Sequence, residues 1–148
     1  MVQFRRIVCA TDFSPTAAVA VGHATELARQ QGGEVVLVHV LPHLAQPFGG
    51  MGMIDSLGPL QAELRDRARE HLTAVGKQFG NGLRLRTELR EGHIAEQVLA
   101  CARESDADLI VLGTHGHTGL QHVLLGSTAE RVVRLAPCPV LTIRSSAP

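Results

Sequence analysis

Residues 109 to 133 read Leu109-Ile-Val-Leu-Gly113-Thr-His-Gly116-His-Thr-Gly-Leu-Gln-His-Val-Leu-Leu-Gly126-Ser127-Thr128-Ala-Glu130-Arg-Val-Val133. The apolar run from 109 to 112 has the length and branching of a central parallel strand that ends at Gly113. A loop with several glycines follows, and a helix is expected to begin at Ser127. Its apolar residues recur at helical spacing, at Ala129, Val132, Val133 and Ala136. At such a junction of strand, loop and helix, free backbone N–H groups lie close together and can bind an anion.

The glycines of this loop favour close approach of a phosphate to the backbone. Gly113 and Gly116 tolerate positive φ and carry no side chain, and Gly126 allows a tight turn into the helix. Ser127 adds a hydroxyl and an N–H at a helix N-terminus, where the dipole stabilises a negative group by about 0.3–1 kcal/mol. The only lysine of the chain is Lys77, outside the loop, so a Walker-type phosphate loop is excluded.

Other interpretations of the same residues remain open. Ser127 and Glu130 have the spacing of a capping box, in which both merely satisfy helix-end donors. His115-x-His117 suggests a metal site, but no acidic or cysteine partner nearby supplies the ligands that zinc requires. The same pair is similar to the histidines of nucleotidyl transferases, although it follows the fourth strand and not the first.

The composition is that of one globular domain spanning residues 1–148. A chain of 148 residues, 45% of them apolar, is long enough to bury about 68–70% of the surface of the unfolded chain. Lys plus Arg and Asp plus Glu number 14 each, so the net charge favours neither nucleic acid nor an anionic membrane as a partner.

No signal peptide opens the chain and no apolar run approaches the ~18–20 residues of a membrane span, so we expect a cytoplasmic protein.

The three cysteines do not indicate a disulfide framework. They form no C-x-x-C pair and their number is odd. Cys9, in an apolar strand, and Cys101, on a helix, are expected to be small buried hydrophobes. Cys138, between two prolines, is a weaker candidate for a redox site.

Strand and helix patterns alternate along the chain. The expected strands are Phe4–Ala10, Glu34–Leu41, Leu83–Leu89, Leu109–Gly113 and Pro139–Ile143. The first helix is expected to have Ser14 as N-cap and Pro15 at its first position, and the third to follow Glu91-Gly92-His93. The second helix is expected to bury Leu60, Leu64, Ala68, Leu72, Val75 and Phe79. Residues 42–58 are rich in Gly, Pro and Met and predict a long loop, either a flap near the site or a disordered insertion.

Five strands alternating with four helices indicate a doubly wound α/β fold with a five-stranded parallel sheet and helices on both faces. Right-handed crossovers with one reversal give the strand order 3-2-1-4-5, with the third and last strands at the edges. The first and fourth strands are then neighbours at the switch point, where ligands bind at the carboxyl ends. This order places Asp12 beside Gly113.

Two residues near this switch point have both a functional and a structural interpretation. The Asp12 carboxylate can accept hydrogen bonds from ribose hydroxyls or stand near a metal on the phosphates, or it can cap the first helix together with Ser14. Val40, at the end of the second strand, can line an apolar slot for a base or be an ordinary core valine.

Four stretches resemble the universal stress protein family, and together they span nearly the whole chain. They are Ile7-Val-Cys-Ala-Thr11-Asp12-Phe13-Ser14, Val38-His39-Val40, Leu112-Gly-Thr-His-Gly-His-Thr-Gly119 and Ala136-Pro-Cys-Pro-Val140-Leu141, with the spacing Gly113-x2-Gly116-x9-Gly126-Ser127. The resemblance implies an ATP-binding domain in which Asp12 contacts ribose and Val40 contacts adenine. It implies phosphate contacts from Gly113, Gly116, Gly126, Ser127 and Thr128, with Mg or Mn on the phosphates, and a homodimer that pairs the last strands, Pro139–Ile143.

The site predicted for ATP or another adenine nucleotide comprises Ala10, Thr11, Asp12, Val40, Leu112, Gly113, His115, Gly116, His117, Gly126, Ser127 and Thr128. His117 and His122 stand where family loops often carry Arg or Lys. Imidazoles are largely neutral at pH 7, so backbone N–H groups would be the main phosphate contacts. No residue is assigned a catalytic role, because the cleft lacks an activated nucleophile with its base.

The expected function is that of a stress-response regulatory domain that binds ATP and hydrolyses it slowly at most. Two alternatives stay open. One is an ATPase or nucleotidyl-transfer enzyme, and the other is a dimeric partner-binding scaffold whose pocket is empty or holds an adenylate other than ATP.

Overall fold

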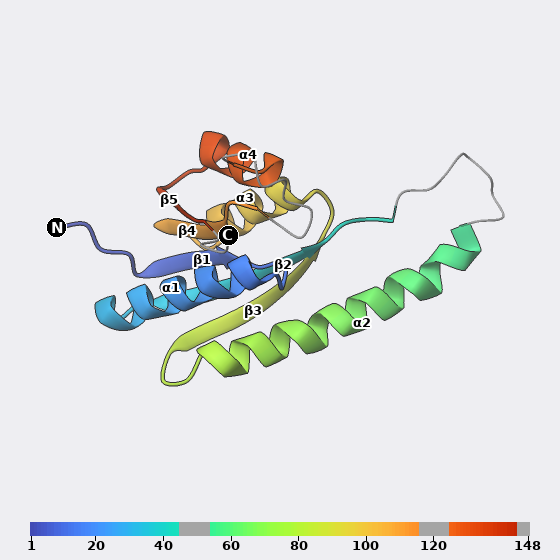
Figure 1. The fold of residues 1–148 in the computed structure, drawn as a ribbon, viewed down its shortest axis with the longest axis horizontal. Helices are drawn as coiled ribbons and strands as arrows, with labels where there is room; N and C mark the ends of the chain where they lie inside the picture. The colour runs from blue at the N-terminus through green and yellow to red at the C-terminus, as the bar shows by residue number, and fades with distance from the viewer. Residues whose placement is uncertain (45–53, 116–124, 145–148) are drawn as a thin grey trace.

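The structure is a computed structural model that describes residues 1–44, 54–115 and 125–144, with the side chains of 54–56 excepted (Figure 1). Strands and helices alternate along the chain. They are β1 (Arg6–Ala10), α1 (Pro15–Gln31), β2 (Glu34–Leu41), α2 (Ile54–Phe79), β3 (Arg84–Glu91), α3 (Ile94–Glu104), β4 (Leu109–Gly113), α4 (Ser127–Leu135) and β5 (Val140–Ile143). Among the described residues, no helix is both long enough and apolar enough to cross a membrane.

The five strands form one parallel sheet in the order β3-β2-β1-β4-β5. The predicted fold class, strand order and edge positions of β3 and β5 are therefore confirmed. Cys9 of β1 pairs with Leu37 of β2 on one side and with Val111 of β4 on the other. The carboxyl ends of β1 and β4 thus lie side by side at the point where the strand order reverses.

Helices cover both faces of the sheet, and each face has its own core (Figure 1). Ile7, Cys9 and Leu37 pack with residues of α1 and α2 on one face. Val38 and Ile110 pack with residues of α3 and α4 on the other. Successive strand residues alternate between the two cores because side chains point to opposite faces in turn.

The ends of α1 form as the sequence predicts. The Ser14 hydroxyl oxygen accepts a hydrogen bond from the Ala17 N–H at 3.2 Å, and Pro15 occupies the first helical position. At the other end Gly32 has the left-handed conformation, with φ 64°, and its N–H reaches the last carbonyls of the helix. Local capping chemistry alone fixes both boundaries.

The start of α2 differs from the expectation. The helix begins at Ile54, so it includes Gly58 and Pro59, which the sequence analysis assigned to the loop or its border. Leu60 is 44% exposed and not buried, whereas Ala68 and Leu72 are buried as predicted. The first turns of α2 extend beyond the strands in Figure 1, so they have no sheet on which to pack. The rest of the predicted loop, residues 45–53, lies outside the described residues.

Burial keeps the cysteine thiols unreactive. Cys9 and Cys101 are buried, as predicted, and burial raises their pKa values to about 12 and about 11. Cys138 is half-buried, and burial raises the pKa of its thiol as well. Because the thiolate is the reactive form, none of the three is activated for redox or nucleophilic chemistry.

Candidate functional site

The chain turns from β1 into α1 through Thr11, Asp12 and Phe13. The Thr11 N–H donates to the Val38 carbonyl at 2.9 Å, and the Phe13 N–H donates to Thr11 Oγ1 at 3.1 Å. The Ser14 N–H donates to Asp12 Oδ1 at 2.9 Å. The Asp12 carboxylate therefore supports the helix start, as the structural interpretation proposed. It does so at the carboxyl edge of the sheet, and a carboxylate can accept about four hydrogen bonds in all.

The end of β4 lies against the first turn of α1. A Cβ atom on Gly113 would lie 3.0 Å from Thr16 Cγ2, so a larger residue here would require Thr16 to shift by a few tenths of an ångström. Gly113 is not among the glycines with positive φ, which in the described parts of the chain are Gly32, Gly82 and Gly92. Gly113 therefore does not use the positive φ that a glycine tolerates, and the close approach of Thr16 is the contact that its missing side chain permits.

The two ends of the glycine loop meet at Thr114. This residue is buried, and its N–H donates to the Ile143 carbonyl at 2.8 Å. Its own carbonyl accepts the N–H of Gly126 at 2.7 Å, and a Cβ on Gly126 would lie 2.9 Å from the same oxygen. Because Gly126 is bonded to Thr114, α4 starts directly beside the end of β4.

The N-cap of α4 is Gly126, and Ser127 is the first helical residue. The capping box predicted as an alternative, with Ser127 as the cap and Glu130 as its partner, is therefore not formed. Helix geometry leaves the N–H groups of Ser127, Thr128 and Ala129 without an acceptor inside the helix, and a glycine cap has no side chain to supply one. Three donors at the positive end of a helix dipole make a cradle suited to an anion.

Apolar residues border this edge on the α3 and α4 side. Val40 is 5% exposed and Leu112 is 4% exposed, and both belong to the core on that face. Ala10 and Leu125 pack against the same core and are partly exposed. Val40 thus has the packing of a core valine, and a base above it would rest mainly on its less buried neighbours.

Two of the predicted site residues, Gly116 and His117, lie outside the described residues, as does His122. His115 is partly buried, with its Nδ1 atom 2.9 Å from Thr114 Oγ1. Among the described residues, no group of three or more His, Cys, Asp or Glu side chains is placed to hold a metal ion.

A group of aromatic and imidazole rings beside the Asp12 turn was not predicted from the sequence. The Phe13 ring lies between two histidines, with centroids 4.4 Å from His39 and 4.9 Å from His71. Phe13 has φ 64°, a left-handed conformation that costs a non-glycine residue about 1–2 kcal/mol. The one signal in the sequence is His39 itself, a polar residue inside the apolar run of β2.

Burial lowers the pKa of His39. The Thr11 carbonyl and the Asp12 carboxylate act in the opposite direction, and His71 adds to the lowering. The His39 Nδ1 atom lies 2.7 Å from the Thr11 carbonyl oxygen. Since a carbonyl only accepts, Nδ1 carries the hydrogen. The ring is thus held as the neutral Nδ1–H tautomer at pH 7.

Lowering the pH from 7.5 to 5 is expected to reduce the free energy of unfolding through His39. The unfolded ring has a pKa of about 6.5, and the folded pKa is lower, so the unfolded state binds more protons as the pH falls. This contribution is complete above about pH 6.5 and is lost as the pH falls through the folded pKa. Urea unfolding at several pH values measures it. His39→Asn cannot titrate and should show a smaller decrease; equal decreases in both proteins would contradict the assignment.

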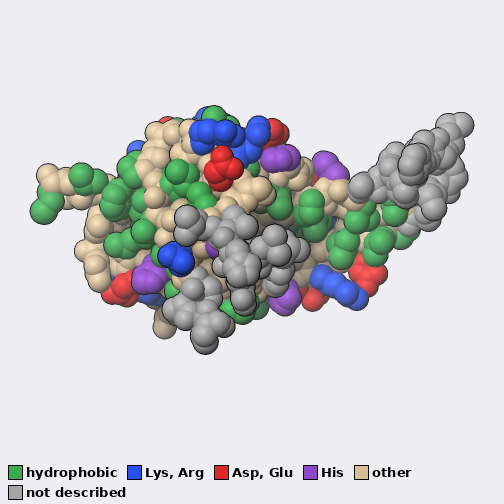
Figure 2. All heavy atoms as spheres, turned by 45° about the horizontal axis from the view of Figure 1, so that its top comes forward, with side chains coloured by type: hydrophobic (Ala, Val, Ile, Leu, Met, Phe, Trp, Pro, Cys, Tyr) green, Lys and Arg blue, Asp and Glu red, His purple; other side chains and the backbone are tan. Residues whose placement is uncertain are grey.

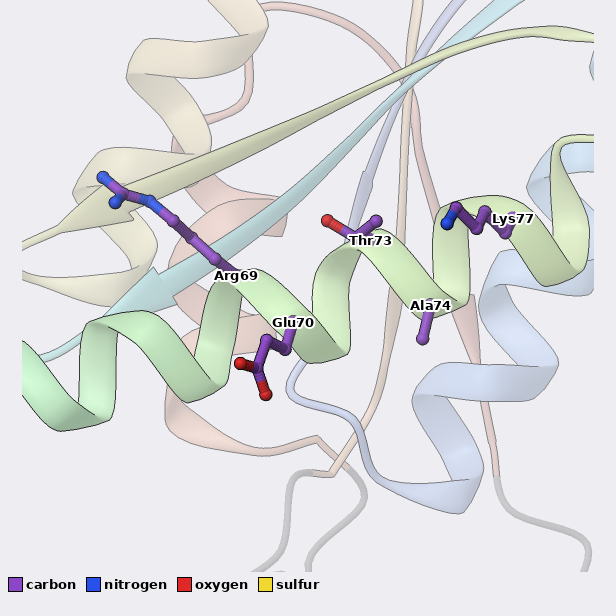
Figure 3. Close-up of a pocket in the computed structure, with 5 residues that line it drawn as sticks. All are labelled: Arg69, Glu70, Thr73, Ala74 and Lys77. Atoms are coloured by element: carbon purple, nitrogen blue, oxygen red, sulfur yellow. The ribbon is translucent and has the colours of Figure 1, made fainter.

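Two surface features outside this edge have no assigned role. Figure 2 shows a face on which Lys and Arg lie beside Asp and Glu and form no single broad basic area. A depression of about 380 Å³ is lined by Arg69, Glu70, Thr73, Ala74 and Lys77. Figure 3 shows that all five project from one helix, α2, and all are exposed. Ligand pockets are concave and bury most of the ligand, and a single helix does not provide such walls.

The fold is that of a doubly wound α/β protein whose strand order reverses between β1 and β4, the position at which proteins of this class commonly bind ligands. The model of the universal stress protein family matches residues 3–144. The chain belongs to the universal stress protein family.

Relatives and solved structures agree with this membership. Universal stress protein MJ0531 of Methanocaldococcus jannaschii is 37% identical over 142 residues, covering 95% of this chain and 82% of that protein. The solved structure of MJ0577 from the same organism is 27% identical, with a TM-score of 0.79 over 99% of this chain and all of that one. A universal stress protein from Archaeoglobus fulgidus, solved in complex with dAMP, is 25% identical, with a TM-score of 0.65 over 97% of this chain and 99% of that one.

Proposed function

We propose that the chain binds ATP or another adenine nucleotide at the carboxyl edge between β1 and β4 and acts as a regulatory domain. The observation that carries the proposal is the start of α4, where three N–H donors follow a glycine cap beside the end of β4. These donors would hold phosphate oxygens. Asp12, on the neighbouring turn, would accept hydrogen bonds from ribose hydroxyls, and the base would lie toward Ala10 and Val40.

The comparisons support an adenine nucleotide as the ligand class. The Archaeoglobus fulgidus protein whose structure contains dAMP shares this fold over nearly its whole length. The described residues fit such a ligand, because the first-turn N–H groups of α4 and the Asp12 turn both lie at the carboxyl edge of the neighbouring strands β4 and β1. Mg or Mn would bind the phosphates and neutralise part of their charge. No nucleophile or general base is assigned, so any hydrolysis would be slow.

Replacing Asp12 with asparagine is expected to weaken ATP binding by about 10- to 100-fold. Asparagine keeps an oxygen for the Ser14 N–H, so the turn should persist, but the charged acceptor for the ribose is lost. A hydrogen bond to a charged group contributes about 1.5–3 kcal/mol, which corresponds to this change in dissociation constant. Calorimetric titration with ATP and with dAMP, each with and without Mg²⁺, measures it.

Asp66→Asn is the matched control, because Asp66 is exposed on α2, and it should bind as the unmodified protein does. Chromatography of freshly purified, denatured protein would reveal any adenylate that copurifies. A protein that carries no nucleotide and shows no thermal shift with ATP would overturn the proposed function. Steady turnover of ATP with Mg²⁺ that disappears in Asp12→Ala would instead identify an enzyme.

A homodimer formed through the last strand belongs to the same proposal. The two edges of the sheet differ in chemistry. On β3, Glu88 forms ion pairs with Arg86 and Arg90, and Arg90 also pairs with Glu104. On β5, Val140–Ile143 has partly buried side chains, three of the four apolar. Charged side chains protect an edge from pairing, so β5 is the edge suited to a second copy.

A further inference from the structure

The His39 imidazole contacts the Asp12 turn in two ways. Its Nδ1–H donates to the Thr11 carbonyl at 2.7 Å, just beyond the end of β1. The face of the same ring lies against Phe13, with a centroid distance of 4.4 Å and an interplanar angle of 32°. One side chain from β2 therefore holds the residues on both sides of Asp12.

The turn needs this support because its backbone is strained. Phe13 adopts a positive φ of 64°, which a bulky residue keeps only where the surroundings fix it. The Phe13 N–H bond to Thr11 Oγ1, the ring contacts with His39 and His71 and the packing against the core under α1 and α2 hold this conformation. If the His39 contacts are removed, the backbone can relax, and Asp12 moves with it.

We propose that His39 is a positioning residue for the nucleotide site, holding the turn from Thr11 to Phe13 in the conformation that presents the Asp12 carboxylate to the ligand. This inference rests on the proposed function, since the ligand is the adenine nucleotide proposed above. His39 itself packs on the α1 and α2 side of the sheet and is not proposed to touch the nucleotide. The titratable groups that act on it are Asp12 from the turn and His71 from α2.

Three substitutions remove the ring and differ only in the hydrogen-bond donor that remains. In His39→Asn the amide nitrogen takes nearly the place of Nδ1 and can still donate to the Thr11 carbonyl. In His39→Gln the amide lies one bond further out, near the position of Nε2, so the donor is misplaced. His39→Leu removes the donor and leaves an apolar side chain of similar bulk.

We expect His39→Leu and His39→Gln to weaken ATP binding by about three- to tenfold, the effect of losing one hydrogen bond. His39→Asn should recover most of the loss. Hydrogen exchange of the Ser14 amide gives a second readout that needs no ligand, since this N–H is bonded to Asp12 Oδ1. Its exchange should accelerate in His39→Leu relative to amides of β4, and should be slower in His39→Asn than in His39→Leu.

The outcomes separate this inference from the function on which it rests. If ATP binds and Asp12→Asn weakens it, but His39→Leu changes neither the affinity nor Ser14 exchange, the positioning role is overturned while the function stands. Equal losses in His39→Asn and His39→Leu would overturn the role of the Nδ1–H donor and assign the effect to the ring contact with Phe13. If the unmodified protein binds no adenine nucleotide, the proposed function fails and the positioning role toward a nucleotide fails with it. Ser14 exchange would in that case still report whether His39 holds the turn.

Discussion

Substituting Gly126 with alanine is expected to weaken ATP binding more than tenfold and to lower the free energy of unfolding by about 1–3 kcal/mol. The new Cβ would lie 2.9 Å from the Thr114 carbonyl oxygen. That oxygen accepts the Gly126 N–H, and the Thr114 N–H is bonded to Ile143, so it cannot retreat without breaking these bonds. The start of α4 must move instead, and its N–H donors move with it. Calorimetric titration with ATP and urea unfolding measure the two effects.

Gly22→Ala is the matched control for this substitution. It makes the same chemical change on α1, where the nearest atom to the new Cβ is Phe79 Cε1 at 3.8 Å, an ordinary contact. An alanine in a helix interior is about 0.8–1 kcal/mol more favourable than glycine, so stability should rise and ATP affinity should not change. Unchanged ATP binding in Gly126→Ala would show that the cradle of N–H groups does not hold the phosphates.

Replacing Ile110 with alanine is expected to cost about 2–5 kcal/mol of stability. Ile110 is fully buried on β4 and packs in the core between the sheet and the helices α3 and α4. Its loss leaves a cavity beneath the strand that carries the glycine loop. Urea unfolding should show a lower midpoint at an unchanged slope. Val133→Ala on α4 is the control: Val133 is 46% exposed, and an exposed position should change stability by no more than about 0.5 kcal/mol. Similar losses in the two variants would contradict this description of the core.

The strands and their order were predictable because each carries a periodic signal. Four-residue apolar runs, a Ser-Pro helix start and a third strand that alternates Leu with charged residues are local patterns, and the structure confirms all of them. Right-handed crossovers then leave few arrangements of five parallel strands. The position of Asp12 at the carboxyl edge beside β4 follows from that order.

The errors concern features that depend on distances between elements. A Gly58-Pro59 pair usually interrupts a helix, but here α2 continues through it, with Pro59 as an interior helical residue. Leu60 is exposed because α2 begins beyond the sheet, which no periodicity reveals. The group of rings around Phe13 was not predictable either, because it joins His39 of β2 to a turn and to His71 of α2, which are far away in the sequence.

The two edge strands of the sheet, charged β3 and apolar β5, limit how many copies of the chain can associate. If two copies pair β5 with β5 about a twofold axis, each copy uses the one edge strand that is suited to pairing. The edges of the resulting ten-stranded sheet are then the two β3 strands with their ion pairs. Such a symmetric contact closes on itself. The charged side chains of β3 then disfavour the addition of further copies, so the assembly ends at a dimer.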